Sequence, residues 1–394
     1  MAKISWPRRA ISLSFWIFSA WYLYISGIAT QSLNFVDTLI SILLANLIFV
    51  SIFTFYAGTG KNKDILFQEA FGAGSARFII SPLPALAQIG WFAVLVEAGG
   101  GALANALNVA TDSIVGISLI ALYGLIATWI ACRGLGTIDR LSLFAIFAMV
   151  GFFGWGAYKA FSQLGASGIF GYQPSGSAGI FFGTQLFLAA FISAAVTIPD
   201  FLHDLGNKKK IFLASFWGLL PTAVAVGALG STLAIIGKDY DVLKTLQFLS
   251  GPFFIYLLFS IDNLKPIAIF PVGTSFASLH KQSEDVAVNE KRRKLWTIAG
   301  GVIAIIFAEI GIVQHLPEWL NILSIVFAPI IGVVLANQYI VKENSTDKRC
   351  HFLALLAWGA GCAASFVPFG IPMPQSLLVA FAIFILLKKV FLPS

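Results

Sequence analysis

The sequence predicts an all-α membrane protein with about twelve transmembrane helices. Apolar residues make up 58% of its 394 residues, and charged residues only 11%, a composition outside the range of soluble globular domains. A helix that crosses a bilayer needs about 20 mostly apolar residues, and runs of this length recur along the whole chain. The loops between them are short, so residues 1–394 are expected to form a single transmembrane domain.

Each expected helix is an apolar run between charged or Pro-, Gly- and Asn-rich breaks. An uncharged Gly/Ser-rich stretch, 163–177, separates the fifth helix from the sixth. The predicted helices cover residues 11–29, 35–58, 78–104, 114–132, 141–157, 180–202, 211–236, 246–276, 295–313, 320–341, 352–369 and 377–391.

The basic residues predict the orientation of the chain, because Lys and Arg collect in cytoplasmic loops. On alternate loops nearly all of the 25 Lys and Arg fall on one side. Only Lys159, Lys238 and Lys244 fall on the other. A multi-pass protein of the cytoplasmic (inner) membrane with both termini in the cytoplasm is therefore expected. The net charge of +7 comes from these loops and forms no patch interleaved with aromatics, so no nucleic-acid partner is expected.

Two apolar runs carry a small polar interruption five helices apart. Phe18-Ser19-Ala20 interrupts the first run, and the segment from Phe191 through Ser193 to Ala194 interrupts the sixth. Transporters built from two inverted repeats unwind such helices, so that free backbone groups line a cavity. Alternatively, the small residues only allow close helix packing.

The third run places Gln88 one turn before Trp91, with prolines at 82 and 84 to loosen the helix. An amide offers a donor and an acceptor to a planar polar edge, and an indole offers a face for stacking. The pair can therefore read a flat heterocycle. The alternative is that Trp91 faces lipid and that Gln88 bonds to a neighbouring helix.

Ionisable residues inside the membrane are costly and usually functional. Asp262 and Lys265 lie at i, i+3 in the eighth run, and Glu97 lies in the third. Asp262 and Lys265 can form a structural ion pair. Alternatively, Lys265 supplies a cation to a transport core, with Glu97 as its partner or as a proton carrier. Glu309 and Asp200, near helix ends, are read as boundary residues.

No enzyme, cofactor or metal signature emerges from the remaining residues. The four histidines are scattered without ligand spacing, and the glycine clusters do not follow predicted strands. The chain is therefore expected to be neither an enzyme nor a metal or cofactor protein.

With these residues in view, the sequence resembles the nucleobase:cation symporter-1 family, in particular its purine/cytosine permease-like members. The resemblance implies a five-plus-five inverted-repeat, leucine-transporter-like core, here 11–161 and 179–341, followed by two additional helices within 352–391. The matching stretches are DTLISILLAN (37–46), AQIGWF (87–92), AFIS (190–193), DF (200–201), FASL (276–279), LNILS (320–324) and PIIGVVLANQY (329–339).

The same resemblance implies where a base would bind. The base would lie between Trp91 and Phe191, with Gln88 and Ser193 contacting its edge. Ala190 replaces a serine of the family pattern, which leaves the particular base open. The implied function is secondary transport of a nucleobase, cytosine or a related pyrimidine or purine. The alternatives are a permease for a related heterocycle, such as hydroxymethylpyrimidine, hydantoin or allantoin, and a non-transporting membrane sensor or enzyme. The sequence does not indicate an oligomeric state.

The eighth helix departs from the family pattern. The resemblance implies a sodium site built from backbone carbonyls near Phe18 and Ser19 and from an asparagine and two hydroxyl residues of helix 8. Those three positions here hold Leu258, Ile261 and Asp262, and a shifted alignment keeps only Ser260. With Lys265 in the same segment, the expectation is transport without sodium. Coupling would then run through protons at Lys265 or Glu97, or the protein would act as a facilitator or exchanger.

Overall fold

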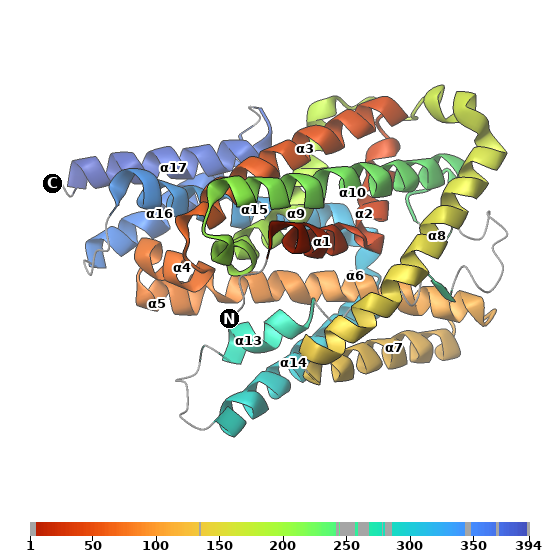
Figure 1. Cartoon of the computed structure of the whole chain (residues 1–394), viewed down its shortest axis with the longest axis horizontal. Helices are drawn as coiled ribbons and strands as arrows, with labels where there is room; N and C mark the ends of the chain where they lie inside the picture. Colours follow the sequence, from red (N-terminus) through yellow and green to blue (C-terminus); the bar gives the residue numbers. More distant parts are fainter. Residues whose placement is uncertain are drawn as a thin grey trace.

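The computed structural model describes residues 5–133, 135–241, 244, 257–258, 268–277, 279, 286–342, 348–367 and 370–391. Every regular element in these ranges is a helix (Figure 1). The helices are α1 (Trp6–Ile17), α2 (Ala20–Thr30), α3 (Phe35–Tyr56), α4 (Lys63–Phe71), α5 (Ala73–Ser75), α6 (Pro82–Ala106), α7 (Ile114–Cys132), α8 (Leu135–Phe170), α9 (Ile180–Leu202), α10 (Lys208–Gly237), α13 (Phe270–Ala277), α14 (Val286–Ile310), α15 (Leu316–Ala336), α16 (Lys348–Ala364) and α17 (Pro372–Phe391). Short 3-10 or π turns cover Ala57–Thr59, Ala76–Ile80, His203–Leu205, Ile312–His315 and Asn337–Val341.

Seven helical segments of the described chain are long and apolar enough to cross a membrane. The broken α1–α2 pair and the shorter α16 fall below this length, although each lies in a predicted span. The predicted all-α membrane fold is therefore confirmed, and the expected count of twelve is consistent with the structure. The seven segments are Phe35–Thr59, Ala73–Ala106, Ile114–Cys132, Ile180–Leu205, Lys208–Gly237, Ile312–Val341 and Pro372–Phe391.

The first predicted span is broken at its polar interruption. Phe18 ends α1 with ψ 82°, and Ser19 is extended with φ −160° and ψ 152°. The helical hydrogen-bond ladder stops there and restarts when the Tyr22 N–H donates to the Ser19 carbonyl, at 3.1 Å. The predicted interruption of this helix is therefore confirmed.

The sixth predicted span is not broken, contrary to expectation. Helix α9 continues through the segment from Phe191 to Ala194 and contains Pro199 near its end. The residues of the segment are compatible with helical geometry, and Pro199 removes only one backbone donor, six residues after Ser193. The small polar interruption is therefore a site for side-chain contacts rather than a break.

Two further boundaries differ from the sequence prediction. Helix α8 extends to Phe170 and kinks at Gly165, whose φ of 63° favours glycine, so half of the Gly/Ser-rich stretch is helical. Helix α14 begins at Val286, before the basic run. Glu290 stabilises this first part by pairing with Arg293 at 2.6 Å, one turn along the helix.

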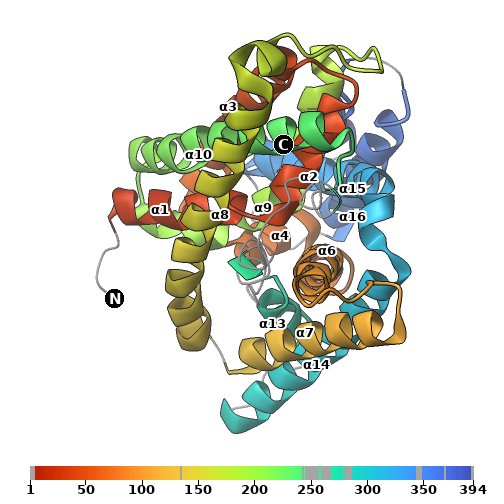
Figure 2. The ribbon, with the colours of Figure 1, turned by 90° about the vertical axis from the view of Figure 1, so that its right-hand side faces the viewer.

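Two apolar cores meet along α6, and a third, small cluster joins α3, α8 and α10. The smaller core joins α6 to α7, α13 and α14, and the larger one joins it to α2, α3, α9, α10 and α15. Ile89 and Phe92 of α6 face the smaller core, whereas Ala87 and Trp91 face the larger one. Figure 2 shows α6 nearly end-on, with α7 and α14 on one side and α2 and α9 on the other. Residues on α6 are therefore placed at the junction of two helix groups.

Helix α10 supports both halves of the broken first span through two glycines. A Cβ on Gly218 would lie 2.6 Å from the carbonyl oxygen of Ala10 in α1. A Cβ on Gly230 would lie 2.7 Å from the carbonyl oxygen of Leu23 in α2. Backbone packs directly on backbone at both crossings, which holds α1 and α2 in line despite the break.

Partly exposed ion pairs link the helix ends at the basic end of the molecule. The Lys63 ammonium lies 2.7 Å from Asp200 at the end of α9, and its backbone N–H donates to the same carboxylate at 2.9 Å. Arg9 of α1 pairs with Asp204 at 2.6 Å. Asp200, interpreted from the sequence as a boundary residue, thus joins the end of α9 to the start of α4. Helix α4, the start of α14 and the end of α17 lie at the same end of the long axis (Figure 1).

Substitution of Gly230 by alanine is expected to destabilise the protein. The added methyl group would meet backbone atoms that have no rotamer with which to move away, and such overpacking costs about 1–3 kcal/mol. Thermal unfolding in detergent micelles measures the loss. Gly154→Ala in α8 is the matched control, because nothing lies within 4 Å of the position that a Cβ would take there. Equal melting temperatures for the two variants would contradict the close crossing of α10 and α2.

Removing the charge of Lys63 is expected to lower the free energy of unfolding more than removing the charge of an exposed lysine. Burial lowers the pKa of Lys63, but the Asp200 and Asp64 carboxylates more than offset this and hold it above its ordinary value. The pair is therefore intact at neutral pH, and its contribution disappears only as pH rises through that raised pKa. Lys63→Met should lower the free energy of unfolding by about 1–3 kcal/mol. Lys244→Met, whose partner is Asp239 and whose side chain is 61% exposed, should cost less than about 1 kcal/mol. A chemical-denaturation series compares them, and equal losses would contradict a tether at Asp200.

Candidate functional site

Trp91 and Ser193 meet between α6 and α9 in the protein interior. The indole N–H of Trp91 donates to the Ser193 hydroxyl oxygen at 3.0 Å. Trp91 is 7% exposed and Ser193 1%, so the alternative that Trp91 faces lipid is wrong. The bond fixes the orientation of the indole, while the Ser193 hydroxyl keeps its own proton for a further acceptor.

The rings of Trp91 and Phe191 are bridged by a third aromatic residue, Trp21 of α2. Its ring centroid lies 5.3 Å from that of Trp91 at an interplanar angle of 51°. It lies 6.0 Å from that of Phe191 at 18°, a stacked arrangement. The two residues that the sequence nominated therefore belong to one buried cluster, with an indole between them.

Phe191 is enclosed on its other sides by rings of α1 and α3. Trp16 lies 6.2 Å away, Phe49 5.3 Å and Phe53 5.9 Å between centroids. Tilted and edge-on contacts of this kind hold an aromatic ring in a defined orientation. Helices on both sides of the α1–α2 break thus converge on Phe191.

Gln88 lies one turn before Trp91 on the same face of α6 and is half-buried. Within the described part of the chain its amide has no hydrogen-bond partner, so the alternative of a bond to a neighbouring helix finds no support there. Two residues further along, Gly90 allows Trp319 of α15 to approach. A Cβ on Gly90 would lie 2.4 Å from that indole. Gln88 thus offers a donor and an acceptor beside the ring cluster.

The structure describes some, but not all, of the residues that are expected to couple to an ion or to replace it. Phe18 and Ser19 form the helix break, where backbone carbonyls leave the regular ladder. Leu258 is buried in the larger core and faces Gly151 of α8; its side chain has no oxygen to offer a cation. Asp262 and Lys265 lie outside the described residues.

Glu97 links α6 to the start of α15. Its carboxylate accepts the backbone N–H of Val313 at 2.9 Å, in the 3-10 turn that precedes α15. Capping a helical turn with a carboxylate stabilises it. Nearby in the sequence, Glu309 has a buried carboxylate oxygen without a partner among the described residues. Glu97 therefore has a structural contact, and the expected contact to Lys265 falls outside the described residues.

Two residues of this region were missed by the sequence reading. Trp21 could have been found as the second residue after the Ser19 break. Gln185 of α9 gave no sequence signal. Its amide donates to the Ser324 hydroxyl at 2.8 Å and accepts the Met373 N–H at 3.0 Å, joining α9 to α15 and α17.

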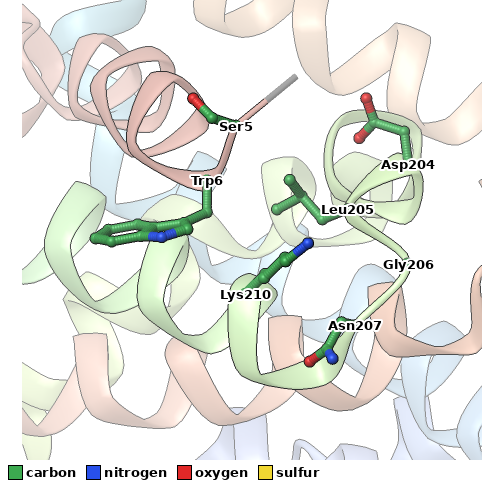
Figure 3. Close-up of a pocket in the computed structure, with 7 residues that line it drawn as sticks. All are labelled: Ser5, Trp6, Asp204, Leu205, Gly206, Asn207 and Lys210. Atoms are coloured by element: carbon green, nitrogen blue, oxygen red, sulfur yellow. The ribbon is translucent and has the colours of Figure 1, made fainter. Parts of the chain in front are cut away.

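A separate pocket of about 410 Å³ opens at the basic end of the molecule (Figure 3). It lies at the start of α1, the opposite end of that helix from the break. Four of its seven lining residues are polar or charged, and Trp6 is the one aromatic residue among them. This pocket is therefore distinct from the ring cluster. It is lined by Ser5, Trp6, Asp204, Leu205, Gly206, Asn207 and Lys210.

Comparison with known proteins yields one family and a consistent fold. A family model described as "Permease for cytosine/purines, uracil, thiamine, allantoin" matches residues 10–372. The chain is similar to the cytosine permease of Escherichia coli strain K12, with 24% identity over 369 residues that cover 90% of this chain and 83% of the relative.

Solved structures share the fold. The inward-facing conformation of Mhp1 has a TM-score of 0.80 at 15% identity, covering 97% of this chain and 90% of that one. Mhp1, a nucleobase-cation-symport-1 family transporter, closed with bromovinylhydantoin bound, has a TM-score of 0.78 at 16% identity, covering 97% and 92%. The relatives are transporters and not enzymes. The chain is a multi-pass membrane permease that belongs to the family of permeases for cytosine/purines, uracil, thiamine and allantoin.

Proposed function

We propose that the protein is a secondary transporter that moves a nucleobase, cytosine or a related pyrimidine or purine, across the cytoplasmic membrane by alternating access. The observation that carries the proposal is the buried convergence of Trp91, Phe191 and Ser193 at the junction of the two cores. An aromatic surface next to a few oriented polar groups is the usual composition of a site for a flat, polar ligand.

The chemistry of these side chains matches a base. Stacking of a base on an aromatic ring is worth about 1–3 kcal/mol, and Trp91 and Phe191 offer two such rings. The Ser193 hydroxyl is oriented by Trp91 and can donate to a ring nitrogen or carbonyl. The Gln88 amide can pair with the donor–acceptor edge that nucleobases present.

The arrangement of the helices supports a rocking mechanism. The α7, α13 and α14 group and the α2, α3, α9 and α10 group have separate apolar cores, and relative motion of two such groups about a fixed site is how inverted-repeat transporters alternate access. The repeats would cover 11–161 and 179–341. Both termini would face the cytoplasm, with the basic helix ends.

A permease for a related heterocycle is the second candidate. The family description includes thiamine and allantoin, and the related Mhp1 structure holds a hydantoin derivative. Hydroxymethylpyrimidine, hydantoin and allantoin share with a base a flat ring and alternating donors and acceptors. Competition between such compounds and cytosine separates the two candidates.

We also propose that transport runs without sodium. Leu258 occupies a position where the family pattern calls for a polar ligand, and it is buried among apolar side chains. Sodium prefers oxygen ligands, which this side chain lacks. Lys265, in the same segment of the chain, supplies a positive charge of its own. Coupling to protons through Lys265 or Glu97, or simple exchange, takes the place of the sodium gradient.

Loss of the ring or of the hydroxyl should impair recognition. In proteoliposome counterflow with labelled cytosine, Trp91→Ala is expected to weaken apparent affinity roughly 5- to 150-fold, because one stacking face is lost. Ser193→Ala should weaken the free energy of cytosine binding by about 0.5–1.5 kcal/mol per lost hydrogen bond. The matched control is Trp129→Ala in α7, whose side chain is 57% exposed and faces away from the cluster. Wild-type protein without any counterflow of cytosine, other bases or related heterocycles would overturn the proposal.

The coupling residue can be identified by separating gradient-driven uptake from exchange. Uptake by the wild type should follow an inward proton gradient, or no ion gradient, and should be insensitive to sodium. If Glu97 carries the proton, Glu97→Gln keeps the acceptor for the Val313 N–H and retains exchange but loses proton-driven uptake. If Lys265 carries the proton instead, Lys265→Ala should likewise retain exchange but lose proton-driven uptake. A steep response to sodium that Lys265→Ala leaves unchanged would refute sodium independence.

A further inference from the structure

Trp21 occupies the space in which the proposed substrate would bind. We infer that Trp21 is a specificity-determining residue, whose indole competes with the substrate for the place between Trp91 and Phe191 and must leave it for a base to bind. This inference rests on the proposed function. It adds a third ring that the sequence pattern did not nominate.

The ring geometry leaves no room for a base beside Trp21. A flat ring needs about 3.5 Å to its neighbour on each face, so two rings that sandwich it stand about 7 Å apart. Trp21 and Phe191 are nearly parallel with centroids 6.0 Å apart, and Trp21 lies 5.3 Å from Trp91. Trp21 is only 9% exposed, so the indole itself fills the space between the other two rings.

The two tryptophans are held in different ways. Trp91 is anchored by its hydrogen bond to Ser193. The Trp21 indole N–H has no hydrogen-bond partner within the described part of the chain, and its neighbours are the rings of Tyr22, Trp91 and Phe191. Displacing Trp21 therefore exchanges one set of ring contacts for another and breaks no polar contact that its side chain makes with the described residues.

The position of Trp21 in the backbone favours such a movement. It is the second residue of α2, and only Ala20 separates it from the non-helical Phe18 and Ser19. The first turn of a helix has no preceding turn to donate to, so its backbone N–H groups lie outside the ladder. A rotamer change or a tilt of this turn can move the indole without unwinding α1 or the rest of α2.

The size of the vacated space sets the direction of specificity. Indole consists of a six-membered and a five-membered ring fused together, the outline of a purine. A pyrimidine needs only part of the space that Trp21 fills, whereas a purine needs nearly all of it. Removal of the indole should therefore favour two-ring bases over one-ring bases.

Equilibrium binding of labelled adenine and cytosine to the purified full chain in detergent tests the inference. Trp21→Ala is expected to bind adenine about tenfold more tightly than the wild type, as loss of a competing ring contact allows, with a smaller gain for cytosine. Trp21→Phe, which keeps one ring, should give an intermediate gain. Trp16→Ala is the matched control, because it also removes a ring beside Phe191 but none beside Trp91, and it should give no gain.

Each outcome distinguishes this inference from the proposed function. If the wild type binds a base and both Trp21 variants bind the two bases equally or more weakly, Trp21 is a wall of the site and the inference is wrong, while the proposed function stands. If neither the wild type nor any variant binds a base, the proposed function fails and the inference fails with it. If Trp21→Ala does not fold, as judged by its melting temperature, Trp21→Phe alone decides between a gain and no gain.

Discussion

The break between α1 and α2 is the constraint on which the site depends. In hydrocarbon, backbone groups that leave the helical ladder must be satisfied or shielded by protein. Here the extended residue Ser19 is 4% exposed, and α10 covers both sides of the break through Gly218 and Gly230. Once that packing shields the break, the first turn of α2 can present a large aromatic side chain to the centre of the molecule.

Helix α6 supplies the complementary half of the site. One face of this helix belongs to the smaller core and the other to the larger core, so Trp91 and Gln88 stand where two helix groups meet. The bond from Trp91 to Ser193 joins α6 to α9 across that junction. A ligand between the same helices would contact both groups at once, which is the requirement for coupling its binding to their relative motion.

The fold was predictable from hydropathy and charge. The bilayer sets the length of each apolar span and the distribution of Lys and Arg between loops, and both can be read directly from the sequence. The first helix break was predictable for a similar reason, since Ser19 interrupts an apolar run. The continuity of α9 was not predictable, because the same small polar pattern either unwinds a helix or receives a side-chain bond. Here the hydroxyl of that pattern receives the N–H of Trp91, a residue distant in sequence. Trp21 was missed because its role arises only when α2, α6 and α9 are packed together.

The two C-terminal helices are tied into the centre of the protein by Gln185. This residue of α9 donates to Ser324 in α15 and accepts the backbone N–H of Met373 at the start of α17. Water cannot replace these partners inside the bilayer without a large penalty. The two C-terminal helices therefore help to hold in place the helix that carries Phe191 and Ser193. A chain shortened before α17 would lose this support for the position of α9 as well as the packing of α17 itself.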